Sequence, residues 1–282
     1  DVILPVLIYY LATSIVLYAL NRLAENILIN QGEGGISILL SNARAISAIN
    51  NGIAMLFGAL LVLRQFIRET SFRGDDMLIK TRKAIGPGFR EGVTKLRERG
   101  NEAIIPVLLC MSAAIFLNLV IGFITDVIGS GNYENIKQTQ YSVTPLIGVI
   151  LYGIISPVAE EMIYRGVLLS KLSRYINPAS GLIASSLIFG LFHGNLVQGV
   201  YAFFLGLLIG AAYIKHNAFF VPLLCHSMTN LLIYLLAYMG IPGTQMVPRI
   251  ITCAVSGVAA ICLFILFMRK RVNENQELKK DK

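Results

Sequence analysis

VTPLIGVILYGIISPVAEEMIYRGVLL, residues Val143–Leu169, is an apolar stretch longer than the roughly 20 residues that a helix needs to cross a bilayer. Three ionisable residues lie within it, Glu160, Glu161 and Arg165. An ionisable group costs about 2.5–3.5 kcal/mol on insertion into a membrane and is usually retained for a function. The stretch therefore predicts a membrane-spanning helix that carries a polar site.

The composition of the whole chain also indicates a membrane protein. Of its 282 residues, 55% are hydrophobic and only 14% are charged, against roughly 25% charged residues in soluble domains. We predict an all-α, polytopic integral membrane protein with about eight transmembrane helices, in which residues 1–282 form a single membrane domain. We expect its location to be a bacterial plasma membrane. The predicted spans are Val2–Leu20, Ile46–Gln65, Ala103–Phe123, Val143–Leu169, Ala179–Asn195, Gly199–Tyr213, Phe219–Met239 and Arg249–Met268.

The distribution of charge predicts the orientation of these spans. Residues 64–99 carry ten Lys and Arg residues against five acidic ones, whereas the connection 126–141 has Lys137 as its only cation. By the positive-inside rule, residues 66–102 form a basic cytoplasmic loop, and with eight spans both termini are cytoplasmic. Residues 69–101 fit either an interfacial amphipathic helix or a solvated loop.

The net charge of +8 does not by itself indicate a nucleic-acid partner. The cations lie in the connections between apolar runs, which is the pattern of membrane proteins. The sequence has no stripe of aromatic and basic residues on which single-stranded nucleic acid would stack. We therefore expect the lipid bilayer as a partner, and no nucleic acid.

Helix geometry separates the two adjacent glutamates of the fourth span. Glu161 and Arg165 are four residues apart, so they share a helix face and can form an ion pair. Glu160 points about 100° away from Glu161. One carboxylate can thus be neutralised while the other faces a cavity, and the neutralised pair fits a structural role.

Two later spans contribute polar residues at the same spacing. His226 and Asn230 are four residues apart in the seventh span and share a face. In the fifth span, Phe189 precedes His193 by four residues, which predicts an aromatic ring beneath the imidazole. Such groups could serve only to hold helices together through hydrogen bonds. The convergence of several costly groups favours a functional site instead.

These residue types are suited to hydrolysis of an amide bond. A carboxylate at Glu160 beside the imidazole of His193 can hold and deprotonate a water molecule. A second imidazole, His226, and the amide of Asn230 can donate hydrogen bonds to an oxyanion. Glu160, His193 and His226 could instead ligate a divalent metal such as zinc, an alternative that spacing leaves open. The HExxH motif of the zincins does not occur in the chain.

Three short motifs, in this order, give the sequence a family resemblance. The segments are Glu160-Glu161-Met-Ile-Tyr-Arg165, which fits EExxxR, Phe189-Gly-Leu-Phe-His193, which fits FxxxH, and His226-Ser-Met-Thr-Asn230, which fits HxxxN. In these motifs the chain resembles the CAAX protease and bacteriocin-processing family (CPBP, or Abi) of intramembrane proteases, which includes the type II CAAX prenyl endopeptidases. The motifs define residues 157–230 as the motif-bearing catalytic core.

The resemblance implies a fold, a mechanism and a class of substrate. It implies eight helices around a conical cavity open to the cytoplasm and the membrane, with Glu160 and His193 activating water and His226 and Asn230 stabilising the oxyanion. The implied supporting residues are Glu161, Arg165 and Phe189. The family has been described both as metalloproteases and as glutamate-dependent, metal-free proteases. We favour no cofactor, and the sequence leaves a zinc ion open.

The implied substrate is a membrane-associated peptide or protein, which could be lipidated. A CAAX-like protein, a bacteriocin precursor and a pheromone precursor all fit. Two other functions also fit the same residues. In a proton-coupled transporter, Glu160 and His193 would form a proton relay, and Pro157 would break the helix beside them. In a non-catalytic immunity protein, the fold would be kept but no peptide bond would be hydrolysed.

Overall fold

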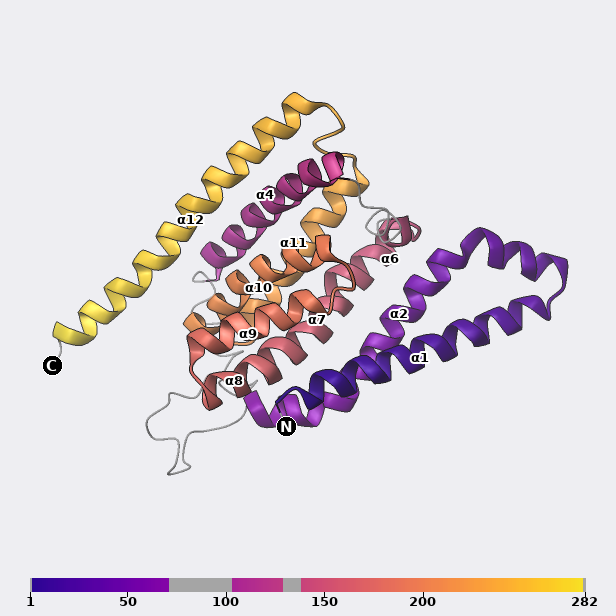
Figure 1. The fold of residues 1–282 in the computed structure, drawn as a ribbon, viewed down its shortest axis with the longest axis horizontal. Helices are drawn as coiled ribbons and strands as arrows, with labels where there is room; N and C mark the ends of the chain where they lie inside the picture. The colour runs from indigo at the N-terminus through magenta and orange to yellow at the C-terminus, as the bar shows by residue number, and fades with distance from the viewer. Residues whose placement is uncertain (1, 71–102, 129–137, 281–282) are drawn as a thin grey trace.

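The computed structural model describes residues 2–70, 103–128 and 138–280, and these are helical with short connections. The helices run alternately up and down in one bundle, with the hairpin of the first two helices splayed to one side (Figure 1). The elements are α1 (Leu4–Ile29), α2 (Glu33–Thr70), α4 (Ile104–Ile128), α6 (Pro145–Ile150), η2 (Leu151–Ile155), α7 (Ser156–Glu161), η3 (Met162–Leu169), α8 (Ser170–Tyr175), α9 (Pro178–Leu191), α10 (Leu196–His216), α11 (Phe220–Tyr238) and α12 (Met246–Lys280).

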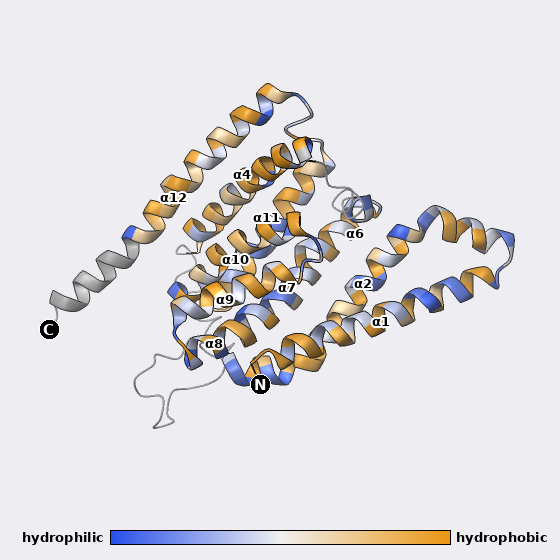
Figure 2. Cartoon of the chain, in the orientation of Figure 1, coloured by the Kyte–Doolittle hydropathy of each residue, from blue (hydrophilic) through white to orange (hydrophobic). Residues whose placement is uncertain are grey.

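The outer surface of the bundle is apolar, as a lipid-facing surface requires. Figure 2 shows that hydrophobic residues predominate along most helices, and many of the large ones are exposed. On α12, Ile250, Val255, Val258 and Ile261 are each more than half exposed, a pattern that water would penalise. In the described part of the chain, seven helices are long and apolar enough to cross a membrane. The predicted all-α polytopic membrane fold is confirmed.

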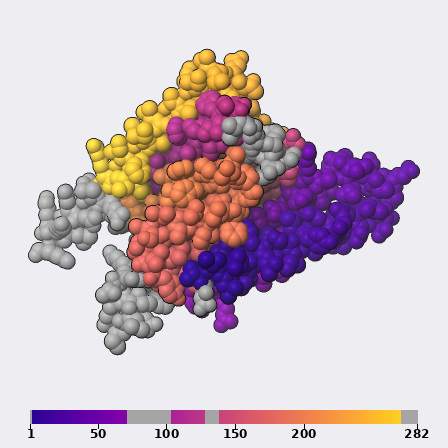
Figure 3. Space-filling view, viewed as in Figure 1, coloured from indigo at the N-terminus to yellow at the C-terminus, as the bar shows by residue number. Residues whose placement is uncertain are grey.

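Each predicted span corresponds to a helix, but several boundaries differ. The first two spans were predicted too short, because α1 and α2 continue into a hairpin that extends beyond the body of the molecule (Figure 3). Residues 66–70 of the predicted loop belong to α2. The remainder of that loop, for which an interfacial helix and a solvated loop were both predicted, lies outside the described residues. The fifth span is α9, whose 14 residues measure only about 21 Å.

The fourth span is one long helix with two π-helical segments, η2 and η3, on either side of α7. Such segments are rare in α-helices and are frequent at functional sites. Pro157 accounts for part of the irregularity, since it has no backbone N–H to donate. In η2 the amide of Ser156 donates to the carbonyl of Leu151, five residues earlier. In the same pattern, the amide of residue 157 would donate to the carbonyl of Tyr152. Because Pro157 has no N–H, this carbonyl receives no hydrogen bond from it.

Close packing of α9 against α10 depends on small residues. A Cβ atom at Gly206 would lie 3.1 Å from the ring of Phe189 and 3.3 Å from Ser186. At Gly210 it would lie 2.4 Å from Leu182. The Gly206–Gly210 pair thus lets two backbones approach, as small residues do in membrane helices. The result is a tight antiparallel hairpin in which four residues join α9 to α10.

Candidate active site

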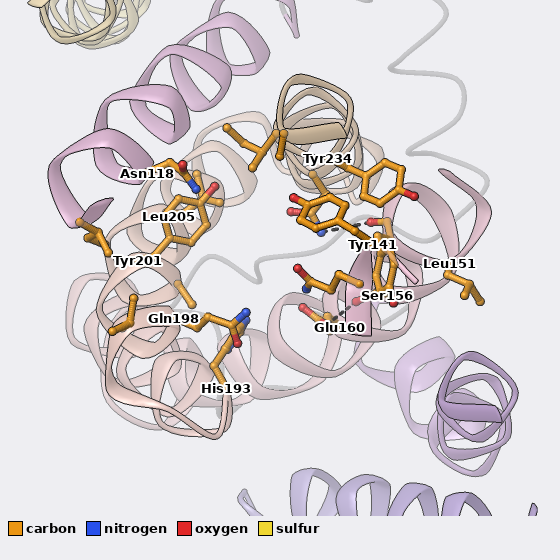
Figure 4. A pocket seen from close by; sticks show the side chains of 18 of the residues that line it. Asn118, Tyr141, Leu151, Ser156, Glu160, His193, Gln198, Tyr201, Leu205 and Tyr234 are labelled. Atoms are coloured by element: carbon orange, nitrogen blue, oxygen red, sulfur yellow. Dashed lines mark hydrogen bonds between the residues drawn. The ribbon is translucent and has the colours of Figure 1, made fainter. Parts of the chain in front are cut away.

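A cavity of about 1270 Å³ lies within the bundle, and all four predicted catalytic residues line it. Glu160 comes from α7, His193 from the connection between α9 and α10, and His226 and Asn230 from α11. Figure 4 shows Glu160 and His193 directed toward the same open space from different parts of the chain. The folded chain therefore brings together residues that are up to 70 positions apart in the sequence.

Glu160 presents a carboxylate to this cavity. Its Oε1 accepts a hydrogen bond from Ser156 Oγ at 2.5 Å, and its Oε2 lies 3.7 Å from His226 Nε2. The side chain is 14% exposed, so it is sheltered but reachable. Ser156 was not among the predicted site residues, although its spacing of four residues from Glu160 places both on one helix face. Ser156 orients the carboxylate and leaves Oε2 facing the cavity.

Glu161 lies on the other side of the helix and is fully buried. Arg165 Nη1 donates to its Oε1 at 2.8 Å, which confirms the predicted ion pair. The guanidinium also donates to the carbonyl of Gly206 at 3.2 Å and lies 4.7 Å from the ring centroid of Phe189. A buried charge needs several such partners to offset its desolvation. The pair ties the fourth span to α9 and α10.

The same glutamate also holds His226, a contact that the sequence did not reveal. His226 Nδ1 lies 2.7 Å from Glu161 Oε1, the oxygen that accepts from Arg165. A carboxylate paired with a guanidinium is ionised and can only accept, so His226 donates through Nδ1. Its Nε2 is then directed toward Glu160. Glu161 therefore fixes the orientation of the second histidine as well as that of the arginine.

His193 lies in the connection between α9 and α10, and its predicted place inside a helix was wrong. The helix ends at Leu191, Gly194 has φ of +76°, and the side chain of Asn195 caps α10 by accepting from the amide of Gln198 at 2.9 Å. Gly and Asn are stop and start signals for helices, and the sequence His193-Gly-Asn contains both. That signal could have placed the histidine correctly.

The connection fixes the ring of His193 from two sides. Its Nδ1 lies 2.7 Å from the carbonyl oxygen of Phe189, which can only accept, so Nδ1 carries a proton. In the neutral ring, Nε2 then offers a lone pair. The ring of Phe189 meets the imidazole edge to face at 4.6 Å between centroids, as the spacing of four residues predicted. His193 is thus an oriented hydrogen-bond acceptor at the cavity.

Asn230 is anchored by the irregular helix opposite it. Its Nδ2 donates to the carbonyl of Tyr152 at 3.2 Å. This is the carbonyl that Pro157 leaves without a helical donor. The proline and the asparagine therefore complement each other across two helices, and the amide of Asn230 is held at the cavity wall.

A metal ion has a poor donor set here. Among the residues that the structure describes, no group of three His, Cys, Asp or Glu side chains is placed to hold a metal ion. Glu160 and His226 approach each other, but His193 does not complete a set with them. Two donors fall short of the three protein ligands usual in catalytic zinc sites. The arrangement of these side chains therefore does not fit the alternative metal site.

Comparison with known proteins identifies the segment that contains this site. Residues 142–232 match the family model described as Type II CAAX prenyl endopeptidase Rce1-like. The match includes every residue of the EExxxR, FxxxH and HxxxN motifs and extends from before α6 into α11. No curated protein and no solved structure matches the chain. The resemblance to CAAX-type intramembrane proteases is confirmed.

Proposed function

We propose that this relative of the type II CAAX prenyl endopeptidases hydrolyses peptide bonds within the bilayer, using Glu160 and His193 to activate water. The observation that supports it most is the convergence of Glu160, His193, His226 and Asn230 on one cavity from three parts of the fold. Each is costly to place in a membrane, and none of the four forms an ion pair with a Lys or Arg side chain among the described residues.

The two activating groups have complementary roles. The Oε2 atom of Glu160 and the Nε2 lone pair of His193 are both acceptors, and a water molecule has two protons to donate. Glu160 takes one proton as the water oxygen attacks the peptide carbonyl carbon. The same carboxyl group then delivers that proton to the leaving nitrogen, so the acid and base steps share one residue. Ser156 holds the carboxylate in place during the cycle.

The oxyanion is stabilised from α11. Asn230 and His226 are one helical turn apart and both line the cavity. Asn230 donates through Nδ2, and His226 donates through Nε2 while Nδ1 remains bound to Glu161. In this role His226 uses both ring nitrogens as donors, which requires its doubly protonated form. Donors fixed before the reaction are more effective than mobile ones in a water-poor site.

The test is peptide turnover by full-length protein reconstituted in lipid. Wild type, Glu160→Gln and Glu33→Gln are compared by mass spectrometry of peptides from the expressing cells and of added peptides. Glu33 is a matched control because it lies at the start of α2, outside the cavity. We expect cleavage by wild type and Glu33→Gln and none by Glu160→Gln. Near-normal turnover by Glu160→Gln would refute the proposed water activation.

The proposed mechanism uses no metal ion, and the lack of a group of three suitable donors among the described residues supports this choice. Dialysis against a chelator is therefore expected to leave the rate of cleavage unchanged. Loss of activity that returns on addition of zinc, with no change in thermal unfolding, would show that Glu160, His193 and His226 rearrange around a metal and would overturn the metal-free mechanism.

A further inference from the structure

The bundle has two ends, and contacts between the helices assign the described connections to them. The basic face is the end at which α2 stops and α4 starts, joined in sequence by residues 71–102. At this end Glu69 is ion-paired with Arg174, and Ala103 and Ala218 are buried in one cluster. The opposite end, which we call the mouth face, has Asp126 of α4 paired with Arg249 of α12 at 2.7 Å.

The cavity opens at the mouth face. Residues from the ends of α4 and α11 and from the start of α12 line it alongside the catalytic groups, together with the segment before α6. This outer part of the lining consists of Thr125, Asp126, Gln140, Tyr141, Ile241, Pro242, Gly243, Thr244 and Arg249. Many of these residues are polar, as suits a passage for a peptide backbone. No residue from the helix ends at the basic face lines the cavity in the described part of the chain.

A packed apolar layer closes the cavity toward the basic face. Phe66 of α2 meets Phe219 of α11 at 4.7 Å between ring centroids, and both are buried. Leu168, Leu169 and Tyr213 belong to the same buried cluster and are 0% exposed. Along their helices these residues lie between the catalytic groups and the basic face. Access to the catalytic groups is therefore one-sided.

The sequence assigns the two faces to the two sides of the membrane. Ten Lys and Arg residues in 64–99 adjoin the basic face. On α12, which runs on to Lys280, Arg269-Lys270-Arg271 follow Phe267, whose carbonyl accepts from Lys215 at this face. The described cations at the mouth face and on the hairpin are Arg22, Arg44 and Arg249, and Arg22 and Arg249 are paired with carboxylates. In the sequence, the connection 126–141 contains Lys137 as its only cation. The positive-inside rule places the more basic side in the cytoplasm. The mouth face is then extracytoplasmic.

We propose that the substrate enters from the extracytoplasmic side, which deepens the proposed function and rests on it. The substrate class is then a peptide segment exposed on, or anchored in, the outer side of the membrane, and not the cytoplasmic tail of a prenylated protein. This differs from the cytoplasmic opening that the family resemblance implies. The two sequence-based expectations, a cytoplasmic basic loop and a cytoplasmic opening, are incompatible in this structure.

Cysteine labelling tests the proposal without depending on catalysis. The four native cysteines are replaced by serine or alanine, and single cysteines are introduced into the full chain. Thr244→Cys probes the mouth, Asn51→Cys probes the cavity wall, and Tyr175→Cys probes the basic face, where that side chain is 65% exposed. Spheroplasts are treated with a charged, membrane-impermeant maleimide before and after permeabilisation.

We expect Thr244→Cys and Asn51→Cys to be labelled in intact spheroplasts and Tyr175→Cys only after permeabilisation. Labelling of Asn51→Cys only after permeabilisation, or the reverse pattern for Thr244 and Tyr175, would overturn the proposed side of entry.

Peptide turnover is measured separately in proteoliposomes with substrate added on one side. Turnover only from the basic face would overturn the inference while leaving the protease function intact. Expected labelling without turnover from either side would refute the protease function alone and support the opening.

Discussion

Substitution of the two adjacent glutamates is expected to separate stability from catalysis. In Glu161→Gln, the guanidinium of Arg165 loses its charged partner at a site where the two side chains are 0% and 2% exposed. Breaking a buried ion pair costs about 3–5 kcal/mol. The new amide oxygen can still accept one hydrogen bond, and Arg165 keeps its contacts with Gly206 and Phe189. We therefore expect a loss of unfolding free energy at the lower end of this range, about 3 kcal/mol. At about 2–4 °C per kcal/mol, Tm should fall by about 6–12 °C.

In Glu160→Gln, by contrast, the substitution affects a carboxylate whose hydrogen bond comes from Ser156. The change in unfolding free energy should stay within about 1 kcal/mol, the usual net value of a hydrogen bond. Glu25→Gln is the control for loss of an ion pair, because its partner Arg22 is 61% exposed and such pairs contribute little. Calorimetry in detergent is the assay, since the chain has no tryptophan. Equal losses of Tm in Glu160→Gln and Glu161→Gln would refute the assignment of separate roles.

Three further variants examine the walls of the site. Asn230→Ala should lower kcat by about 10²–10³, the usual cost of removing an oxyanion donor, with KM nearly unchanged in peptide-cleavage assays. Pro157→Ala restores an N–H that competes for the carbonyl of Tyr152, so kcat should fall by about tenfold or more without loss of Tm. Gly190→Ala would place a Cβ atom 2.6 Å from the carbonyl oxygen of Gly199, so Tm should fall with a cost of about 1–3 kcal/mol.

Contacts within one helix could be predicted from the sequence because helical periodicity fixes which residues share a face. The pair of Glu161 with Arg165 follows from a spacing of four residues, and so does the edge-to-face contact of Phe189 with His193. The contact between Glu161 and His226 could not be predicted this way. It joins residues 65 positions apart and depends on the relative rotation of two helices. Rotation is set by packing, which no local pattern encodes.

The size of the cavity and the side on which it opens could not be predicted from the sequence either. Hydropathy gives the same signal for a helix that faces lipid and for one that lines a cavity with a few polar groups. The lengths of α1 and α2 were underestimated for a related reason, since polar residues near their shared turn end the apolar runs without ending the helices. Charge asymmetry predicts sidedness, but only packing shows which end of the bundle is closed.

Pro157 shows why the structure favours a hydrolase over the transporter alternative. A proline in a membrane helix leaves a backbone carbonyl without its donor, and in transporters such freed groups line the path of an ion. Here the freed carbonyl of Tyr152 is occupied by Asn230 from the neighbouring helix, so it is not available to a passing ion. The layer that contains Phe66 and Phe219 closes the bundle toward the basic face. A fixed donor on the wall of a one-sided cavity is an arrangement for holding a reacting group, and the irregular helix is part of what fixes it.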